Sequence, residues 1–213
     1  MFFEYGAKET AYLKKKDKRL GEVIERVGHL ERKVYPDLFA ALLFYIAGQQ
    51  ISGRARDAIW GRVLARFPTL NASAILSANP EELRALGLSE RKIEYMRGVA
   101  MKVAEGELRL EELNTLSDAE IIARLTALKG IGVWTAEMLL LFSLCRPNVF
   151  STGDLGIQRG LRMIYHHRVL TPAMLKRYAG RFSPYGSVAA FYVWEVAGGA
   201  LPEYRDYAAP NRN

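Results

Sequence analysis

Between two segments of helical periodicity the chain reads Leu128-Lys129-Gly130-Ile131-Gly132-Val133-Trp134-Thr135-Ala136. Two glycines one residue apart favour a tight bend between the helices. Such a bend exposes backbone N–H groups at the start of the second helix, where anions such as phosphate bind. An ordinary helix–helix turn has the same pattern, so the bend alone leaves both interpretations open.

A single acidic residue follows the bend. Asp154 is the only Asp or Glu between Met138 and Trp194, in a stretch otherwise rich in Arg and Lys. An Asp at the start of a helix usually serves as its N-cap. The N-terminus of a helix also favours the ionised form of a carboxylate. The capping role is therefore compatible with a chemical role that needs a negative charge.

Composition narrows the class of protein. The 213 residues can bury a sizeable core as one domain or two packed lobes, and the net charge of +7 favours a polyanionic partner. Cys145 is the only cysteine, which excludes intrachain disulfides and a cysteine-ligated cluster. His166 and His167 lack ligand-like spacing, so we expect no metal held by side chains. Without a membrane-length apolar run or a secretory h-region, we expect a cytoplasmic protein, nucleoid-associated if the source is bacterial.

The periodicity predicts an all-α fold, because no segment alternates convincingly enough to be a strand. Residues 38–46 are apolar on all sides and should form a central buried helix. Further helices are predicted from their start signals: Asn79-Pro80, Ser89, the capping box Ser117–Glu120, Thr171-Pro172, and Pro184 for the last helix, which should run to about Ala197.

Three features together resemble the helix-hairpin-helix (HhH-GPD) superfamily of DNA glycosylases, most closely the DNA-3-methyladenine glycosylase II family. They are the hairpin 128–132, the loop ending at Asp154, and Gly48-Gln49-Gln50-Ile51-Ser52. The resemblance runs from about Pro36 to Ala197. It implies one glycosylase unit over 1–213, made of two helical lobes with the active site in the cleft between them. The central lobe would be 34–143, and 1–33 with 144–213 would form the lobe that carries Asp154.

The resemblance also implies a partner and a reaction. A monomer would bind double-stranded DNA with damaged bases, flip one base out, and use Asp154 as the catalytic carboxylate. Relatives that also cut the strand have Lys where this chain has Trp134. Without an amine there is no covalent imine, so hydrolysis by water without lyase activity is expected. Because Cys145 is alone, the relatives' iron–sulfur cluster is excluded as well.

The chemistry favours alkylated purines such as 3-methyladenine. Cleavage of the N-glycosidic bond builds positive charge on the sugar, which a fixed carboxylate stabilises. An N-alkylated purine is already cationic, so it leaves without an acid and binds aromatic faces. We therefore assign Trp134, Tyr185 and Met138 to the base pocket, with burial in the core as the alternative for the two aromatic residues. Trp60 and Trp194 are interpreted as core residues.

The remaining assignments concern DNA. Gln50, with Gln49 beside it, occupies the position from which relatives fill the gap left by a flipped base. Capping of free helix-end carbonyls is the alternative for both glutamines. Lys129, Gly130, Gly132 and Thr135 should bind DNA phosphates. The resemblance implies room for a Na⁺ or K⁺ ion at the backbone carbonyls of Leu128 and Ile131, and no other cofactor.

Two other functions fit the same sequence. The fold could act on deaminated, oxidised or mismatched bases, whose neutral leaving groups require extra hydrogen-bond donors in the pocket. It could also be a non-catalytic DNA-binding module in which Asp154 only caps its helix.

Overall fold

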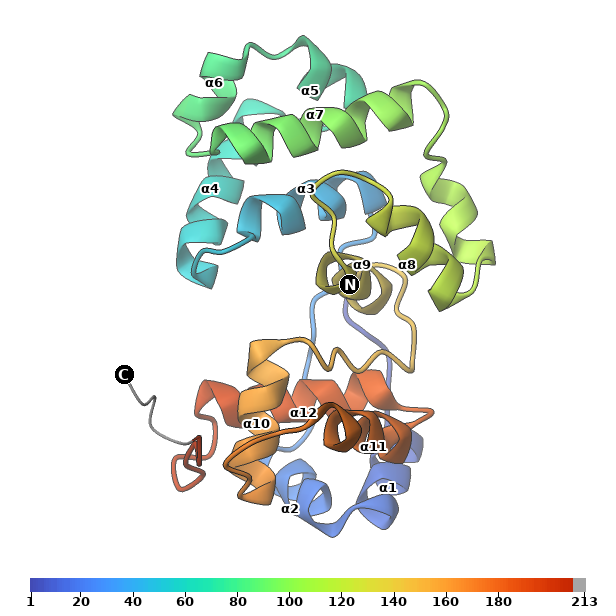
Figure 1. Ribbon diagram of the computed structural model, residues 1–213, viewed down its shortest axis with the longest axis vertical. Coiled ribbons are helices and arrows are strands. Elements are labelled where there is room, and N and C mark those ends of the chain that lie inside the picture. The colour runs from blue at the N-terminus through green and yellow to red at the C-terminus, as the bar shows by residue number, and fades with distance from the viewer. Residues whose placement is uncertain (209–213) are drawn as a thin grey trace. The chain divides into compact units, whose positions relative to one another are not determined.

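The computed structural model describes residues 1–208 and divides into two compact units (Figure 1). Unit 1 comprises Met1–Val34 and the chain from Cys145 onward, and unit 2 is Tyr35–Leu144. Within residues 1–208 every regular element is a helix, and one isolated bridge pairs Phe2 with Lys33. The predicted all-α fold is confirmed.

Unit 2 is built around one buried helix. Its elements are α3 (Leu38–Gly48), α4 (Gly53–Arg66), α5 (Ala72–Ser77), α6 (Pro80–Ala85), α7 (Glu90–Ala104), the 3₁₀ helix η1 (Leu110–Thr115), α8 (Asp118–Thr126) and α9 (Val133–Phe142). Helix α3 is buried without interruption from Ala41 to Ala47 and packs against α4, α7 and α9. The central buried helix expected from the apolar run is confirmed.

Unit 1 combines helices from both ends of the chain: α1 (Ala7–Lys16), α2 (Lys18–Val27), α10 (Leu155–Tyr165), α11 (Pro172–Phe182) and α12 (Gly186–Gly198). The most extensive helix pair in this unit is α10 with α12. A side chain at Gly160 of α10 would overlap the carbonyl oxygen of Val193 of α12. The glycine therefore allows a close crossing, which fixes the helix that begins after Asp154.

Local signals place most helix starts correctly. Asn79, Ser89, Ser117 and Thr171 each accept a first-turn backbone N–H through the side chain. The last helix is an exception, since it begins at Gly186 and not at Pro184. Its first N–H groups bond to the side chain of Asn148 and the carbonyl of Pro147, so a distant loop sets this start.

Across residues 1–208, no helix combines the length and the apolar character needed to cross a membrane.

Candidate active site

In unit 2 the Gly-x-Gly bend joins α8 to α9 and is held by contacts from two other helices. Gly130 has a φ of +86°, and a side chain there would overlap the ring of Tyr95 on α7. The carbonyl of Gly130 accepts a hydrogen bond of 2.8 Å from Nε2 of Gln49, the C-cap of α3. Only glycine meets both the backbone and the packing requirement at this position.

Gly132 has a different role. It is the N-cap of α9 with an ordinary φ of −94°, and a Cβ there would find no atom within 4 Å. It offers no side chain to cap the first N–H groups of α9. The start of α9 thus combines backbone donors and the positive end of the helix dipole with open space around the N-cap.

Two side chains predicted to bind phosphate, those of Lys129 and Thr135, already make contacts within unit 2. Lys129 is exposed and lies 2.5 Å from Glu94, and this hydrogen bond raises the pKa of the Lys129 ammonium. Thr135 is 2% exposed, with its hydroxyl 3.4 Å from Nε2 of Gln49. Its side chain therefore packs inside the bend, and a phosphate contact of Thr135 stays a prediction. Thr135 is the third residue of α9, on the side that faces Gln49, and this was not evident from the motif.

The two glutamines differ in position. Gln49 is half-buried and bonded to the hairpin, so the capping alternative describes it, although the carbonyl it binds belongs to Gly130. Gln50 is exposed and has a φ of +57°. Of the pair, Gln50 alone presents an exposed side chain.

Trp134 lies in the first turn of α9 and is 36% exposed. Its ring meets the ring of Tyr45 edge-on, with centroids 6.4 Å apart. Met138, one turn further along, is 4% exposed. The roles of Trp134 and Met138 in a base pocket stay predictions.

In unit 1 the carboxylate of Asp154 is held by two donors. Oδ1 accepts the backbone N–H of Ile157 at 2.9 Å, as expected for the N-cap of α10. The same oxygen accepts the indole Nε1–H of Trp194 on α12 at 2.8 Å. Hydrogen bonds to the charged form stabilise it and fix its direction.

Trp194 is a residue of the candidate site that the sequence interpretation missed. We expected a core position, but the side chain is half-buried and bonded to Asp154. A Cβ at Gly156 would lie 2.8 Å from Cδ1 of Trp194 and 3.0 Å from Oδ1 of Asp154, so this glycine admits the indole. A signal was present, because a partly buried indole N–H needs an acceptor and Asp154 is the only carboxylate in the stretch.

The loop before Asp154 is anchored from both sides. Gln158 on α10 donates to the carbonyl of Thr152 at 2.9 Å. The buried hydroxyl of Ser187 on α12 accepts the N–H of Val149 at 2.9 Å and donates to the carbonyl of Arg146. These bonds tie the loop to the same two helices that hold the carboxylate.

Tyr185, assigned to the base pocket, is the half-buried N-cap of α12. Its ring meets the ring of Tyr12 edge-on, with centroids 5.2 Å apart.

Of the two histidines, His167 bonds to the hydroxyl of Tyr178 at 2.7 Å, whereas His166 is exposed. Residues 1–208 contain no group of three His, Cys, Asp or Glu side chains placed to hold a metal ion. The carbonyl of Leu128 accepts the N–H of Ile131 at 3.1 Å, and a monovalent cation at this bend stays a prediction.

Known proteins are similar to this chain in sequence and in fold. The family model described as HhH-GPD superfamily base excision DNA repair protein matches residues 44–184. DNA-3-methyladenine glycosylase 1 of Schizosaccharomyces pombe is 33% identical over 189 residues, covering 85% of this chain and 78% of that protein. The crystal structure of a DNA-3-methyladenine glycosidase from Bacillus halodurans has a TM-score of 0.82 and 37% identity, covering 97% of both chains.

A further solved structure is the 3-methyladenine DNA glycosylase of S. pombe in complex with abasic DNA. It has a TM-score of 0.84 and 29% identity, and the match covers 94% of this chain and all of that one. The chain belongs to the HhH-GPD superfamily of base excision DNA repair proteins and, within it, to the DNA-3-methyladenine glycosylases.

Proposed function

We propose that the protein hydrolyses the N-glycosidic bond of alkylated purines in DNA, with Asp154 as the catalytic carboxylate. The observation that carries this proposal is the double hold on Oδ1 of Asp154 by Ile157 and Trp194. A carboxylate fixed in this way stabilises the positive charge that develops on the sugar, and it orients or deprotonates the attacking water.

The leaving group explains why one acid is enough. A 3-methyladenine or 7-methylguanine base carries a positive charge before the bond breaks, so it departs as a neutral base without protonation. Trp134, which is 36% exposed, offers an electron-rich face to such a cation. Tyr185 is the second aromatic residue that we assign to the base.

The strand remains intact after the base has left. Trp134 occupies the position at which strand-cutting relatives use Lys, and an indole forms no imine with the sugar. The product is therefore an abasic site in a continuous strand.

Binding of DNA rests on the hairpin and on Gln50. The N–H groups at the start of α9 bind a backbone phosphate, with Gly132 leaving room for its approach. The exposed Gln50 enters the gap left by the flipped base. The monovalent cation at the carbonyls of Leu128 and Ile131, the monomeric state and the cytoplasmic location stay predictions.

Methylated DNA tests the proposal. The wild-type protein should release 3-methyladenine and 7-methylguanine, and Asp154→Asn should lower the rate by at least about a hundredfold while the protein still binds DNA. Asp37→Asn is the matched control, because Asp37 caps α3 through the same kind of bond and Asn is an equally good cap. The control should release bases at the wild-type rate.

Release that survives Asp154→Asn would contradict the mechanism. Nicks that form without heat or alkali would contradict hydrolysis without lyase activity. Release of uracil or hypoxanthine in preference to methylated purines would contradict the assigned substrate class.

A further inference from the structure

Unit 2 contains a second site suited to an anion, beside the hairpin. A cavity of about 140 Å³ is lined by Gln49, Gln50, Ser89, Arg91, Lys92 and Tyr95. Two of these side chains are cationic and the others are neutral, and none is Asp or Glu. The composition of its wall therefore favours a negatively charged ligand.

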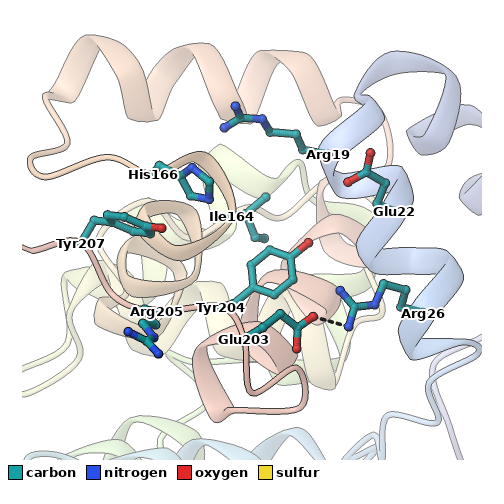
Figure 2. A pocket seen from close by; sticks show the side chains of 9 residues that line it. All are labelled: Arg19, Glu22, Arg26, Ile164, His166, Glu203, Tyr204, Arg205 and Tyr207. Atoms are coloured by element: carbon teal, nitrogen blue, oxygen red, sulfur yellow. Dashed lines mark ion pairs between the residues drawn. The ribbon is translucent and has the colours of Figure 1, made fainter.

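A larger pocket, in unit 1, is lined by both cationic and acidic side chains. It measures about 270 Å³ and includes Glu22 and Glu203 among its lining residues (Figure 2). There Arg26 is ion-paired with Glu203. That pocket neutralises part of its own positive charge, whereas the cavity of unit 2 does not.

Neither cation of the unit 2 cavity has a carboxylate partner within residues 1–208. Lys92 donates to the carbonyl of Ala47 at the end of α3 at 2.7 Å, and partial burial lowers the pKa of its ammonium. The guanidinium of Arg91 lies over the ring of Tyr95, 5.9 Å from the centroid. By contrast, the predicted phosphate ligand Lys129 is already paired with Glu94.

The cavity shares its wall with the hairpin. Gln49 bonds to the carbonyl of Gly130, and the ring of Tyr95 packs directly against the same glycine. Gln50, the residue assigned to the gap in the DNA, lies on the wall as well. A DNA backbone held at the hairpin would thus have a neighbouring phosphate within reach of this cavity.

We infer that this cavity binds a second phosphate of the DNA backbone, next to the step that Gln50 enters, with Arg91 as its main charged ligand. The inference rests on the proposed function only in that the protein binds DNA. Arg91 and Lys92 supply the charge, and the hydroxyl of Ser89, whose oxygen accepts the N–H of Lys92 at 3.4 Å, keeps its own proton to donate. Arg91, and not Lys129, is then the principal cationic side chain at this part of the interface.

Binding to a duplex with a tetrahydrofuran abasic analogue tests the inference, since no base can be released from it. Arg91→Gln should weaken binding by about tenfold at low salt and reduce the slope of log Kd against log salt by about 1. Arg109→Gln is the matched control, because it removes the same charge just beyond the opposite end of α7, where Arg109 pairs with Glu112. The control should leave the slope unchanged.

Equal slopes for wild type, Arg91→Gln and Arg109→Gln would overturn the inference while leaving base release untouched. Inorganic phosphate, added at constant ionic strength, separates a backbone phosphate from a free one. It should leave the Kd for the duplex unchanged. Tight binding of phosphate to the wild type that disappears in Arg91→Gln, together with equal salt slopes for the duplex, would assign the cavity to free phosphate instead. A wild-type protein that fails to bind the duplex would contradict the proposed function itself.

Discussion

At the scale of single residues, the proposed chemistry depends on how Asp154 is held. The backbone bond from Ile157 belongs to the local structure of a helix start, whereas the indole bond comes from a residue 40 positions away. Together they give the carboxylate a fixed direction before any substrate arrives. Preorganisation of this kind supplies much of the stabilisation of a charged transition state.

Trp194→Phe tests the contribution of the indole. The substitution keeps an aromatic ring in α12 but removes the donor to Oδ1, so we expect kcat to fall about tenfold with little change in KM. Trp60→Phe in α4 is the control, because Trp60 packs edge-on against Phe44 and, within residues 1–208, donates to no carboxylate. Single-turnover release of 3-methyladenine measures both variants.

An equal loss in both tryptophan variants would mean that Trp194 acts only through general packing. A rise in KM without a fall in kcat would place Trp194 in substrate binding and not in the positioning of Asp154.

Local signals in the sequence predicted the helix start at Asp154, but they could not predict its hydrogen bond to Trp194. The position of Asp154 at a helix start follows from neighbouring residues, so it could be predicted. The bond to Trp194 requires Gly156 and Gly160 to bring α10 and α12 together, which depends on packing between distant segments. The burial of the Thr135 side chain could not be predicted either, since it depends on contact with Gln49 at the end of α3.

At the scale of elements, the hairpin assigns different tasks to its two glycines. Gly130 is required by the fold, because of its positive φ and the ring of Tyr95. Gly132 meets no such demand from the protein itself. Helix starts such as those after Ser89 and Ser117 could be predicted because a cap is local, whereas the start of α12 depends on Asn148 and could not.

Alanine substitutions separate the two tasks. Gly130→Ala should lower the free energy of unfolding by about 2 kcal/mol or more, because of its backbone conformation and the overlap with Tyr95. Gly132→Ala should change it by less than about 1 kcal/mol, the scale of a helix cap, yet weaken DNA binding about tenfold by occupying the space at the helix start. Thermal unfolding and binding to the abasic duplex measure these effects.

Loss of stability in Gly132→Ala comparable to that in Gly130→Ala would show that both glycines serve the fold. Unchanged DNA binding by Gly132→Ala would remove the start of α9 from the interface.

At the scale of the whole molecule, the order of the segments determines how unit 1 is assembled, and the net charge of +7 favours binding to a polyanion. Unit 1 is assembled from both ends of the chain, so its pairing of α2 with α10 and α12 is long-range. The net charge was evident from composition. The distribution of that charge was not evident from composition. Only the folded protein shows that Lys129 pairs with Glu94, whereas Arg91 has no carboxylate partner within residues 1–208.

Salt should weaken DNA binding in proportion to the phosphates contacted. The hairpin phosphate is bound by backbone N–H groups, so the phosphate at the cavity of Arg91 alone predicts about a threefold loss of affinity between about 50 and 200 mM monovalent salt. Fluorescence anisotropy with the abasic duplex measures the slope. A Kd that stays constant over this range would contradict a backbone-dominated interface.

Because the space around Gly132 is open, a side chain there should affect DNA binding without affecting folding. A library of hairpin variants screened for expression should lose substitutions at Gly130 and retain Ala at Gly132. The same library selected for survival under a methylating agent should lose both. Residues that a stability screen tolerates and a survival selection rejects would then trace the surface that meets DNA.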